Sequence, residues 1–165
     1  MCNLQGRIPD SIGYLAKLQH LDVSHNNLIG PWPSGFSKLV KLGSLQLYQN
    51  KLEGEIPKDI GKMGLLEWLD AYDNMLLGMI LEGLGDLTRL ISLNLFENRL
   101  SGEIPAGIAE LTMLKSLKLF GNSFTGQIPQ KLGSKTQFEV LELSQNQLCG
   151  PLPSQLSNGR KLQIH

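Results

Sequence analysis

The sequence has no excess of charge of either sign. Its 15 lysine and arginine residues balance 15 aspartate and glutamate residues, and its pI is about 6.8. Proteins that bind nucleic acid or an anionic membrane surface usually carry a basic patch. We therefore expect no nucleic-acid partner.

Long apolar runs are absent as well. The most apolar stretch extends only from Met75 to Leu81, whereas a helix needs about 20 apolar residues to cross a bilayer. The N-terminal residues lack the basic and apolar regions of a signal peptide. We expect no membrane insertion by this chain.

Cysteine is scarce. Cys2 and Cys149 lie near opposite ends of the chain. Two cysteines so far apart in sequence show no disulfide framework and leave the redox compartment open.

What the sequence does contain is an internal repeat. Aligned against itself at a spacing of 24 residues, the chain brings leucine, asparagine, glycine and proline into register. Such a period is typical of a solenoid. Repeats begin at Leu18, Leu42, Leu66, Leu90, Leu114 and Phe138. With a partial repeat over residues 1–17 and a stub over residues 162–165, we predict one solenoid over residues 1–165.

The repeat frame, LxxLxLxxNxLxGxIPxxIxxLxx, predicts the local structure. In its LxLxx segment side chains alternate, so that Leu93 and Leu95 point inward while Asn94 and Phe96 point outward. This pattern predicts one short strand per repeat, and stacked repeats would pair these strands in parallel. The segments after each Ile-Pro pair are long enough only for a helical turn or a 3₁₀ piece.

Asparagine and glycine occupy two further fixed positions. A short amide at the turn can bond backbone groups of its own coil and of the next one, which predicts an asparagine ladder. The glycine position is one that a Cβ would crowd. The asparagines are Asn26, Asn50, Asn74, Asn98, Asn122 and Asn146, and the glycines are Gly30, Gly54, Gly78, Gly102, Gly126 and Gly150.

This frame resembles the plant-type leucine-rich repeat. GRIPDSIGYL, GEIPKDIGKM, GEIPAGIAEL and GQIPQKLGSK are the stretches closest to that family's pattern. The resemblance implies a β-rich α/β solenoid, a right-handed horseshoe arc with a parallel concave sheet and short 3₁₀ or irregular convex segments. It also implies a receptor-like kinase or receptor-like protein, on the extracellular face of the plasma membrane or secreted.

Both ends differ from a complete family member. The resemblance implies capping segments with paired cysteines, and neither end has them. Cys2 and Cys149 would lie six coils apart, about 29 Å at the strand spacing, whereas a disulfide needs Cα atoms within about 7 Å. We expect no bridge between them and interpret the chain as an internal fragment or a truncated gene product.

The repeat assigns outward residues to columns on the concave face. One column is Asp22, Gln46, Asp70, Asn94, Lys118 and Glu142, and the next is Ser24, Tyr48, Tyr72, Phe96, Phe120 and Ser144. Four consecutive coils therefore present an aromatic ring, and Trp68 joins them from a neighbouring column. Such rings can stack on one another or clamp a ligand.

Two carboxylates in LDAYDN, Leu69 to Asn74, suggest chemistry when taken alone. In register, Asp70 and Asp73 join Glu67 and Glu97 in an acidic, aromatic patch. Catalysis and metal binding need side chains that converge in a sheltered pocket, whereas an open curved sheet spreads them apart. We expect no catalytic residue, metal site or cofactor.

A second stretch, LDVSHN, contains the residue types of a hydrolase triad. His20, Asp22 and Ser24 are successive outward positions about 6.6 Å apart on a strand, with no strained elbow or oxyanion donors. We interpret the match as coincidence. A milder hypothesis is that His20 and His25 make partner binding depend on pH.

The repeat from Leu66 to Arg89 is the least regular. Ala71 replaces an inward leucine, Leu81 replaces the proline, and Met75, Leu77 and Met79 lie around the turn. One interpretation is drift, with the extra methyl groups filling space that Ala71 leaves. The other is a local kink that serves binding.

The favoured function is a non-enzymatic recognition module, a fragment of a plant receptor ectodomain that binds a peptide or protein ligand and possibly a co-receptor. A kinase domain would lie outside this chain. The alternatives are a secreted polygalacturonase-inhibitor-like protein and a truncated, non-functional array. The predicted ligand-binding residues are Tyr48, Trp68, Asp70, Tyr72, Asp73, Phe96, Glu97, Lys118 and Phe120.

Overall fold

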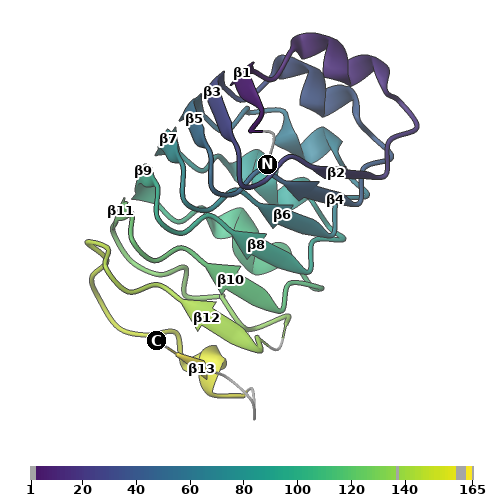
Figure 1. Cartoon of the computed structure of the whole chain (residues 1–165). Coiled ribbons are helices and arrows are strands. Elements are labelled where there is room, and N and C mark those ends of the chain that lie inside the picture. The colour runs from purple at the N-terminus through teal and green to yellow at the C-terminus, as the bar shows by residue number, and fades with distance from the viewer. Residues whose placement is uncertain (1–2, 137, 159–162, 165) are drawn as a thin grey trace.

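Successive coils stack so that their strands form two parallel sheets (Figure 1). The structure, a computed structural model, describes residues 3–136, 138–158 and 163–164. The seven-stranded sheet, which we call the first sheet, has the order β13-β12-β10-β8-β6-β4-β2. Its strands are β2 (His20–Asp22), β4 (Ser44–Gln46), β6 (Trp68–Asp70), β8 (Ser92–Asn94), β10 (Ser116–Lys118), β12 (Val140–Glu142) and β13 (Gln163–Ile164).

The six-stranded sheet, which we call the second sheet, lies beside it, in the order β1-β3-β5-β7-β9-β11. Its strands are β1 (Gln5–Arg7), β3 (Asn27–Pro31), β5 (Lys51–Glu55), β7 (Met75–Met79), β9 (Arg99–Glu103) and β11 (Ser123–Thr125). The sequence analysis predicted one strand per repeat, which is too few. The signal was present, because in Lys51–Glu55 exposed charged residues alternate with buried Leu52 and half-buried Gly54, the pattern of a half-buried strand.

The two sheets differ in register. The first sheet pairs residues one repeat apart, such as Ser44 with Trp68. The second sheet pairs residues 22 apart, such as Glu53 with Met75, so that equivalent residues are displaced by two positions in each coil. A displacement of two keeps every side chain on its own face, because side chains alternate with a period of two.

Short 3₁₀ helices complete the coils, as predicted. They are η1 (Asp10–Tyr14), η2 (Ser34–Lys38), η3 (Ile60–Lys62), η4 (Glu82–Asp86), η5 (Ala106–Glu110) and η6 (Ser154–Asn158). Pro33 directly precedes η2 and Pro105 directly precedes η5, and both have extended backbone angles. The proline ring fixes φ at a value that suits this extended backbone. The predicted fold class is confirmed.

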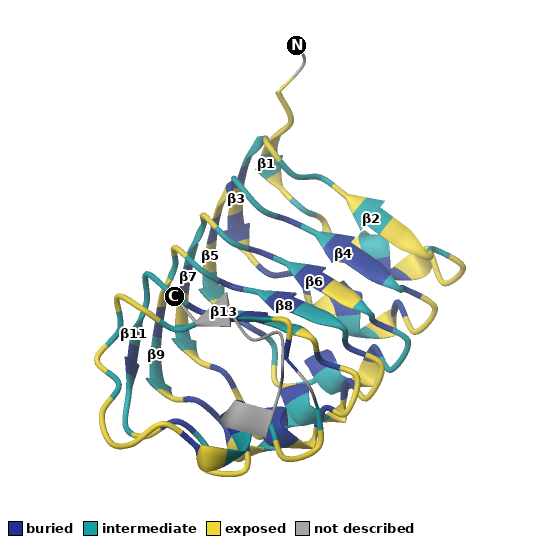
Figure 2. Cartoon of the chain, turned by 90° about the horizontal axis from the view of Figure 1, so that it is seen from below, coloured by how far each residue is buried: buried dark blue, intermediate teal, exposed yellow. Residues whose placement is uncertain are grey.

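The core is a set of apolar columns enclosed by the sheets and the 3₁₀ helices. Leu45, Leu69, Leu93 and Leu117 are fully buried from the first sheet, and Leu76 is fully buried from the second. Figure 2 shows buried residues recurring at matching places from coil to coil. Burial of each leucine side chain stabilises the fold by roughly 1.5–3 kcal/mol. Because the apolar columns run from coil to coil, each coil supplies a wall of its neighbour's core.

The asparagine ladder forms, with one correction. The Nδ2 of Asn98 donates to the carbonyls of Leu95 at 3.1 Å and Ala71 at 3.0 Å, and its Oδ1 accepts from the N–H of Leu76 at 3.0 Å. Ala71 and Leu76 belong to the preceding coil, not to the next one as predicted. Each asparagine thus joins its own coil to the coil before it.

The recurring glycines have positive φ, which the crowding argument did not predict. Gly78 and Gly102 lie at φ of 78° and 79°. A Cβ on Gly102 would lie 2.7 Å from Cγ of Met79 in the preceding coil. The position therefore needs glycine both for its backbone angle and for the neighbouring side chain that crosses it.

The irregular coil keeps its place in both sheets. Strand β7 pairs with β5 and β9 in the same register as its neighbours, so the coil makes no break in the pairing. Ala71 is fully buried, but Leu77 and Met79 are 44% and 55% exposed. The interpretation that these side chains fill space left by Ala71 is therefore wrong, because they lie on the outer face of the second sheet.

Two further predictions can be compared with the structure only in part. Cys149 is an exposed free cysteine, whereas Cys2 lies outside the described residues, as do parts of the segments 1–17 and 162–165. Within the described ranges, no helix is both long and apolar enough to cross a membrane.

Candidate functional site

Four aromatic rings form a continuous stack along the outer face of the first sheet. Tyr48 and Tyr72 stack at 4.5 Å between centroids, Tyr72 and Phe96 at 4.2 Å, and Phe96 and Phe120 at 4.4 Å. Interplanar angles are 8–12°. The separations are close to the strand spacing of about 4.8 Å, because each coil supplies one ring. We call these four residues the aromatic stack.

Stacking leaves little of the ring faces free for a ligand. Between neighbours each face is covered by the next ring, so a ligand can contact the edges of the stack but not enter between rings. His25 packs edge-on against Tyr48 at 4.9 Å, which covers one end. The hydroxyls of Tyr48 and Tyr72 make no hydrogen bond within the described part of the chain, and each is therefore available to a partner.

A polar row runs beside the aromatic stack. The pairing of the strands places Gln46, Asp70, Asn94, Lys118 and Glu142 next to one another in that order. We call these residues the inner row. The Nδ2 of Asn94 donates to Asp70, and Lys118 forms an ion pair with Glu142 at 3.2 Å. The charge of Lys118 is thus already partnered before any ligand arrives.

Asp70 has an altered ionisation. Burial raises the pKa of its carboxyl group above the usual value, while the hydrogen bond from Asn94 and the charge of Lys118 oppose this shift. Burial also raises the pKa of Tyr72, and its neighbours Tyr48, Asp70 and Asp73 contribute to that rise. Both acidic residues of LDAYDN therefore flank Tyr72.

Asp73 and Glu97 occupy the turn beyond the aromatic stack. Both are exposed, and their φ values are 52° and 53°, in the left-handed region. Gln49 and Gln145 adopt the same angle at the equivalent position, and Gly121 takes it at 64°. The turn geometry fixes where these two carboxylates lie. Glu67, which the sequence analysis grouped with them, lies at the other end of strand β6 and lines a groove with Trp68.

Trp68 does not extend the aromatic stack. Within the described residues it makes no ring contact, and it is 39% exposed. It borders a separate groove of about 340 Å³ at the other end of its strand. The other residues lining this groove are Gln19, His20, Lys41, Gly43, Leu65, Glu67 and Arg89.

Lys41 and Arg89 were missed by the sequence analysis. Neither takes part in an ion pair among the residues that the structure describes, so two cationic groups beside Trp68 are available to an acidic or aromatic group of a ligand. Each is the residue directly before the start of a repeat, and the two positions are two repeats apart. Aligning the residues at this repeat position would have identified both cations.

The triad-like residues do not form a catalytic arrangement. The Oγ of Ser24 donates to Asp22 at 2.7 Å, and this bond lowers the pKa of Asp22 together with the N–H of Ser24. The serine hydroxyl thus donates its hydrogen bond to the aspartate and not to a histidine. In the described ranges, no group of three or more histidine, cysteine, aspartate or glutamate residues could hold a metal ion.

Comparisons with known proteins agree with this architecture. A family model described as Leucine Rich Repeat matches residues 17–39, 41–63, 89–111, 113–134 and 137–158. The irregular coil is the segment between the second and third matches. A search of the curated proteins found no match.

Among solved structures, the Arabidopsis receptor kinase HAESA, in complex with the peptide hormone IDA and the co-receptor SERK1, is 39% identical with a TM-score of 0.94. The alignment covers 98% of this chain and 27% of that one. The ectodomain of GASSHO1/SCHENGEN3 from Arabidopsis thaliana, in complex with CASPARIAN STRIP INTEGRITY FACTOR 2, is also 39% identical, with a TM-score of 0.95 and coverage of 98% and 20%.

A plant ice-binding protein is 32% identical, with a TM-score of 0.85 and coverage of 93% of this chain and 51% of that one. This chain therefore spans between a fifth and about half of these structures.

Proposed function

The chain belongs to the leucine-rich repeat family, and from this membership we propose that it binds a peptide or protein ligand on the outer face of its first sheet. It is a recognition module and not an enzyme. The single observation that carries the proposal is the aromatic stack, four rings held in line just beyond the ends of four adjacent strands. The proposed contact residues are Tyr48, Trp68, Asp70, Tyr72, Asp73, Phe96, Glu97, Lys118 and Phe120.

The aromatic stack suits recognition because its rings are ordered before a ligand arrives. Each ring is half-buried and packed against its neighbours, so little side-chain entropy remains to be lost on binding. Ring edges provide apolar contact, and the free hydroxyls of Tyr48 and Tyr72 provide hydrogen bonds. Aromatic residues of this kind are frequent energetic anchors in interfaces.

The surroundings of the aromatic stack define the ligand's chemistry. Asp73 and Glu97 are exposed carboxylates on one side, whereas Lys41 and Arg89 are cations beside Trp68 at the other end of the strands. A bound segment running parallel to the strands would thus meet opposite charges at its two ends. We propose a peptide with a basic or donor group over the turn and an acidic group near Trp68.

The cellular setting is proposed from the structural neighbours. HAESA is an Arabidopsis receptor kinase in complex with a peptide hormone, and GASSHO1/SCHENGEN3 is a plant membrane receptor kinase in complex with CASPARIAN STRIP INTEGRITY FACTOR 2. Their similarity supports a place in the ectodomain of a plant cell-surface receptor. In this setting the chain works outside the cell, and we propose a co-receptor as a second partner. A kinase activity would belong to a part of the receptor beyond these repeats.

A selection from a random-peptide display library tests the site. Peptides that bind the folded chain are titrated against the double variant Tyr72→Ala/Phe96→Ala, whose stack is interrupted. The matched control is Ile29→Ala/Leu77→Ala, which removes two exposed apolar side chains from the second sheet. We expect the stack variant to bind at least about tenfold more weakly and the control to bind normally. Equal affinity in both double variants would place the ligand site elsewhere.

A further inference from the structure

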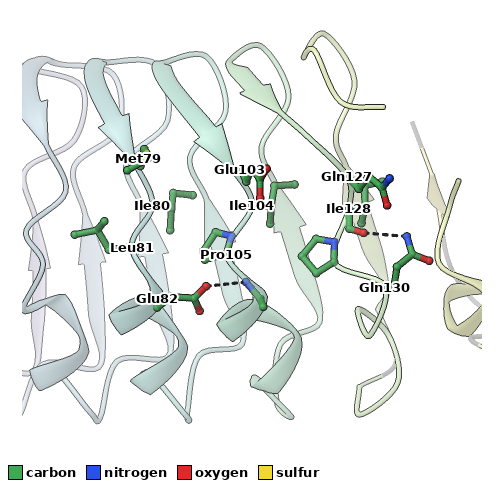
Figure 3. Close-up of a pocket in the computed structure, with 12 residues that line it drawn as sticks. Met79, Ile80, Leu81, Glu82, Glu103, Ile104, Pro105, Gln127, Ile128 and Gln130 are labelled. Atoms are coloured by element: carbon green, nitrogen blue, oxygen red, sulfur yellow. Dashed lines mark hydrogen bonds between the residues drawn. The ribbon is translucent and has the colours of Figure 1, made fainter. Parts of the chain in front are cut away.

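A second concave site lies on another face of the molecule. It is a groove of about 570 Å³ between the second sheet and the 3₁₀ helices, which we call the side groove. Figure 3 shows that the same four repeat positions from three successive coils line it, Met79–Glu82, Glu103–Ala106 and Gln127–Gln130. Its volume is in the range of small-molecule and peptide sites.

The sequence explains why the groove opens at these coils. The last of the four positions holds Glu82, Ala106 and Gln130 in turn. The middle side chain ends at Cβ, whereas its neighbours on both sides are long. Ala106 therefore leaves an open space between two walls.

Hydrogen bonds hold both walls in place. The carboxylate of Glu82 accepts from the N–H groups of Ala106 at 3.2 Å and Gly107 at 2.8 Å. The Nε2 of Gln130 donates to the carbonyls of Ile128 at 3.1 Å and Pro151 at 3.4 Å. Figure 3 marks bonds of both side chains, so the walls are formed before any ligand binds.

The upper border is held by the glycine column. Met79 crosses Gly102, and Glu103 crosses Gly126, where a Cβ would lie 2.9 Å from Cγ of Glu103. The lack of a Cβ lets these long side chains lie along the sheet and keeps the groove open below them.

The lining combines an apolar floor with negative charge. Ile80, Ile104 and Ile128 form the floor and are 3%, 3% and 7% exposed. Glu82 and Glu103 are its two charged residues, and no lysine, arginine or histidine lines it. The carboxylate of Glu82 accepts from backbone N–H groups, whereas the carboxylate of Glu103 makes no ion pair or hydrogen bond within the described part of the chain.

The dimensions limit what fits. Two spacings of about 4.8 Å separate the first of the three coils from the third, so the groove is roughly 10 Å long between its outer rows. This length has room for about three extended residues at 3.3 Å each. An aliphatic side chain suits the isoleucine floor, and a cation suits the carboxylate of Glu103.

We propose that the side groove binds a short peptide segment of a partner protein, in which an aliphatic side chain is flanked by lysine or arginine. The segment lies across the three coils, with its aliphatic side chain above Ile104 and its cation at Glu103. This site is on a different face from the aromatic stack and does not depend on the function proposed for that stack.

A groove-filling variant provides the main test. Peptides selected from a random-peptide display library on the folded chain are titrated against Ala106→Trp, which fills the space between Glu82 and Gln130. The matched control is Lys58→Trp, at the same repeat position but outside the groove. Both positions are exposed, and far-ultraviolet circular dichroism checks that both variants fold.

We expect a class of selected peptides that carry an aliphatic residue next to lysine or arginine. These should bind Ala106→Trp at least about tenfold more weakly and bind Lys58→Trp and the stack variant Tyr72→Ala/Phe96→Ala normally. If no selected peptide distinguishes Ala106→Trp from Lys58→Trp, the proposal is overturned.

A charge reversal tests the cation. Glu103→Lys should weaken binding of the same peptides, and the loss should shrink at high salt because the interaction is exposed. Selected peptides that are acidic, or affinity unchanged in Glu103→Lys, would contradict the proposed chemistry. Concentration-dependent dimers in analytical ultracentrifugation that Ala106→Trp abolishes would show that a second copy occupies the groove, which also overturns the proposal.

Discussion

The irregular coil, Leu66–Arg89, and the coil after it, Leu90–Met113, have the same strands and strand pairing but different side chains. Both place three residues in the first sheet and five in the second, with the same register. Asn74 and Asn98 make equivalent ladder bonds. In the core, Ala71 stands where the next coil has Leu95. On the first sheet, Trp68 and Asp70 stand in place of Ser92 and Asn94, and further differences lie on the outer surface of the second sheet.

The comparison shows which repeat positions the fold controls. Asparagine and glycine stay because backbone groups and a positive φ require them. The outer positions are free to change, because side chains there contact solvent. The irregular coil has Met79 where the next coil has Glu103, and Leu81 where the next coil has Pro105, with no change in strand pairing. Both residues add apolar surface to the side groove.

Exchanging the core residues should have the largest effect. Leu95 and Ala71 are both fully buried, so each site is packed for its own side chain. Leu95→Ala should lower the free energy of unfolding by about 2–5 kcal/mol through a cavity, and Ala71→Leu by about 1–3 kcal/mol through overpacking. Urea unfolding measures both. A stabilised Ala71→Leu would show that the irregular coil contains unfilled space.

Breaking the ladder should have the next largest effect and be alike in the two coils. Asn98→Ala leaves the N–H of Leu76 without its acceptor, whereas the carbonyl of Ala71 keeps its bond from Asn74, so we expect a cost of about 1–3 kcal/mol for the one unsatisfied group. Asn74→Ala should cost a similar amount. Unequal losses in urea unfolding would show that the irregular coil relies less on its ladder.

Exchanging the proline tests a smaller difference. Leu81 has φ of −87° and Pro105 has φ of −66° at the same repeat position. Leu81→Pro should raise the free energy of unfolding by about 0.4–1 kcal/mol by restricting the unfolded chain. Pro105→Leu is the reciprocal variant and should lower it by a similar amount. A destabilised Leu81→Pro would indicate that the irregular coil has a backbone unlike its neighbour.

Exchanging Asp70 for the residue of the next coil should have the smallest effect, visible in its pH dependence. Burial raises the pKa of Asp70 in the folded state, so the ionised carboxylate opposes folding above its unfolded pKa. Asp70→Asn should therefore stabilise the chain at neutral pH, and this gain should fade as pH falls toward 3 because both states become protonated.

Asp22 provides the opposite case as a control. Hydrogen bonds from Ser24 lower its pKa, so its charge favours folding above the unfolded pKa and the benefit is lost as pH falls through the folded pKa. Asp22→Asn should thus destabilise the chain at neutral pH and have little effect in acid. Chemical unfolding at pH 7 and pH 3 measures both variants, and the same sign for both at pH 7 would contradict this assignment.

Much of the site was predictable from the repeat. The column that contains Tyr48, Tyr72 and Phe96 was identified because strand residues alternate between faces. The repeat could not decide whether the rings stack, because that depends on side-chain rotamers. It also placed Trp68 with them, although its position at the far end of the strand puts it in another groove.

The sequence by itself determined the repeat length, the parallel first sheet, the ladder and the glycine turns, because each depends on local periodicity and backbone demands repeated every 24 residues. Only the tertiary structure decided the second sheet's displaced register, the closed faces of the aromatic stack and the side groove. These arise between coils, where residues 22 to 25 positions apart meet, such as the carboxylate of Glu82 and the N–H of Gly107, and such contacts depend on how one coil is displaced against the next.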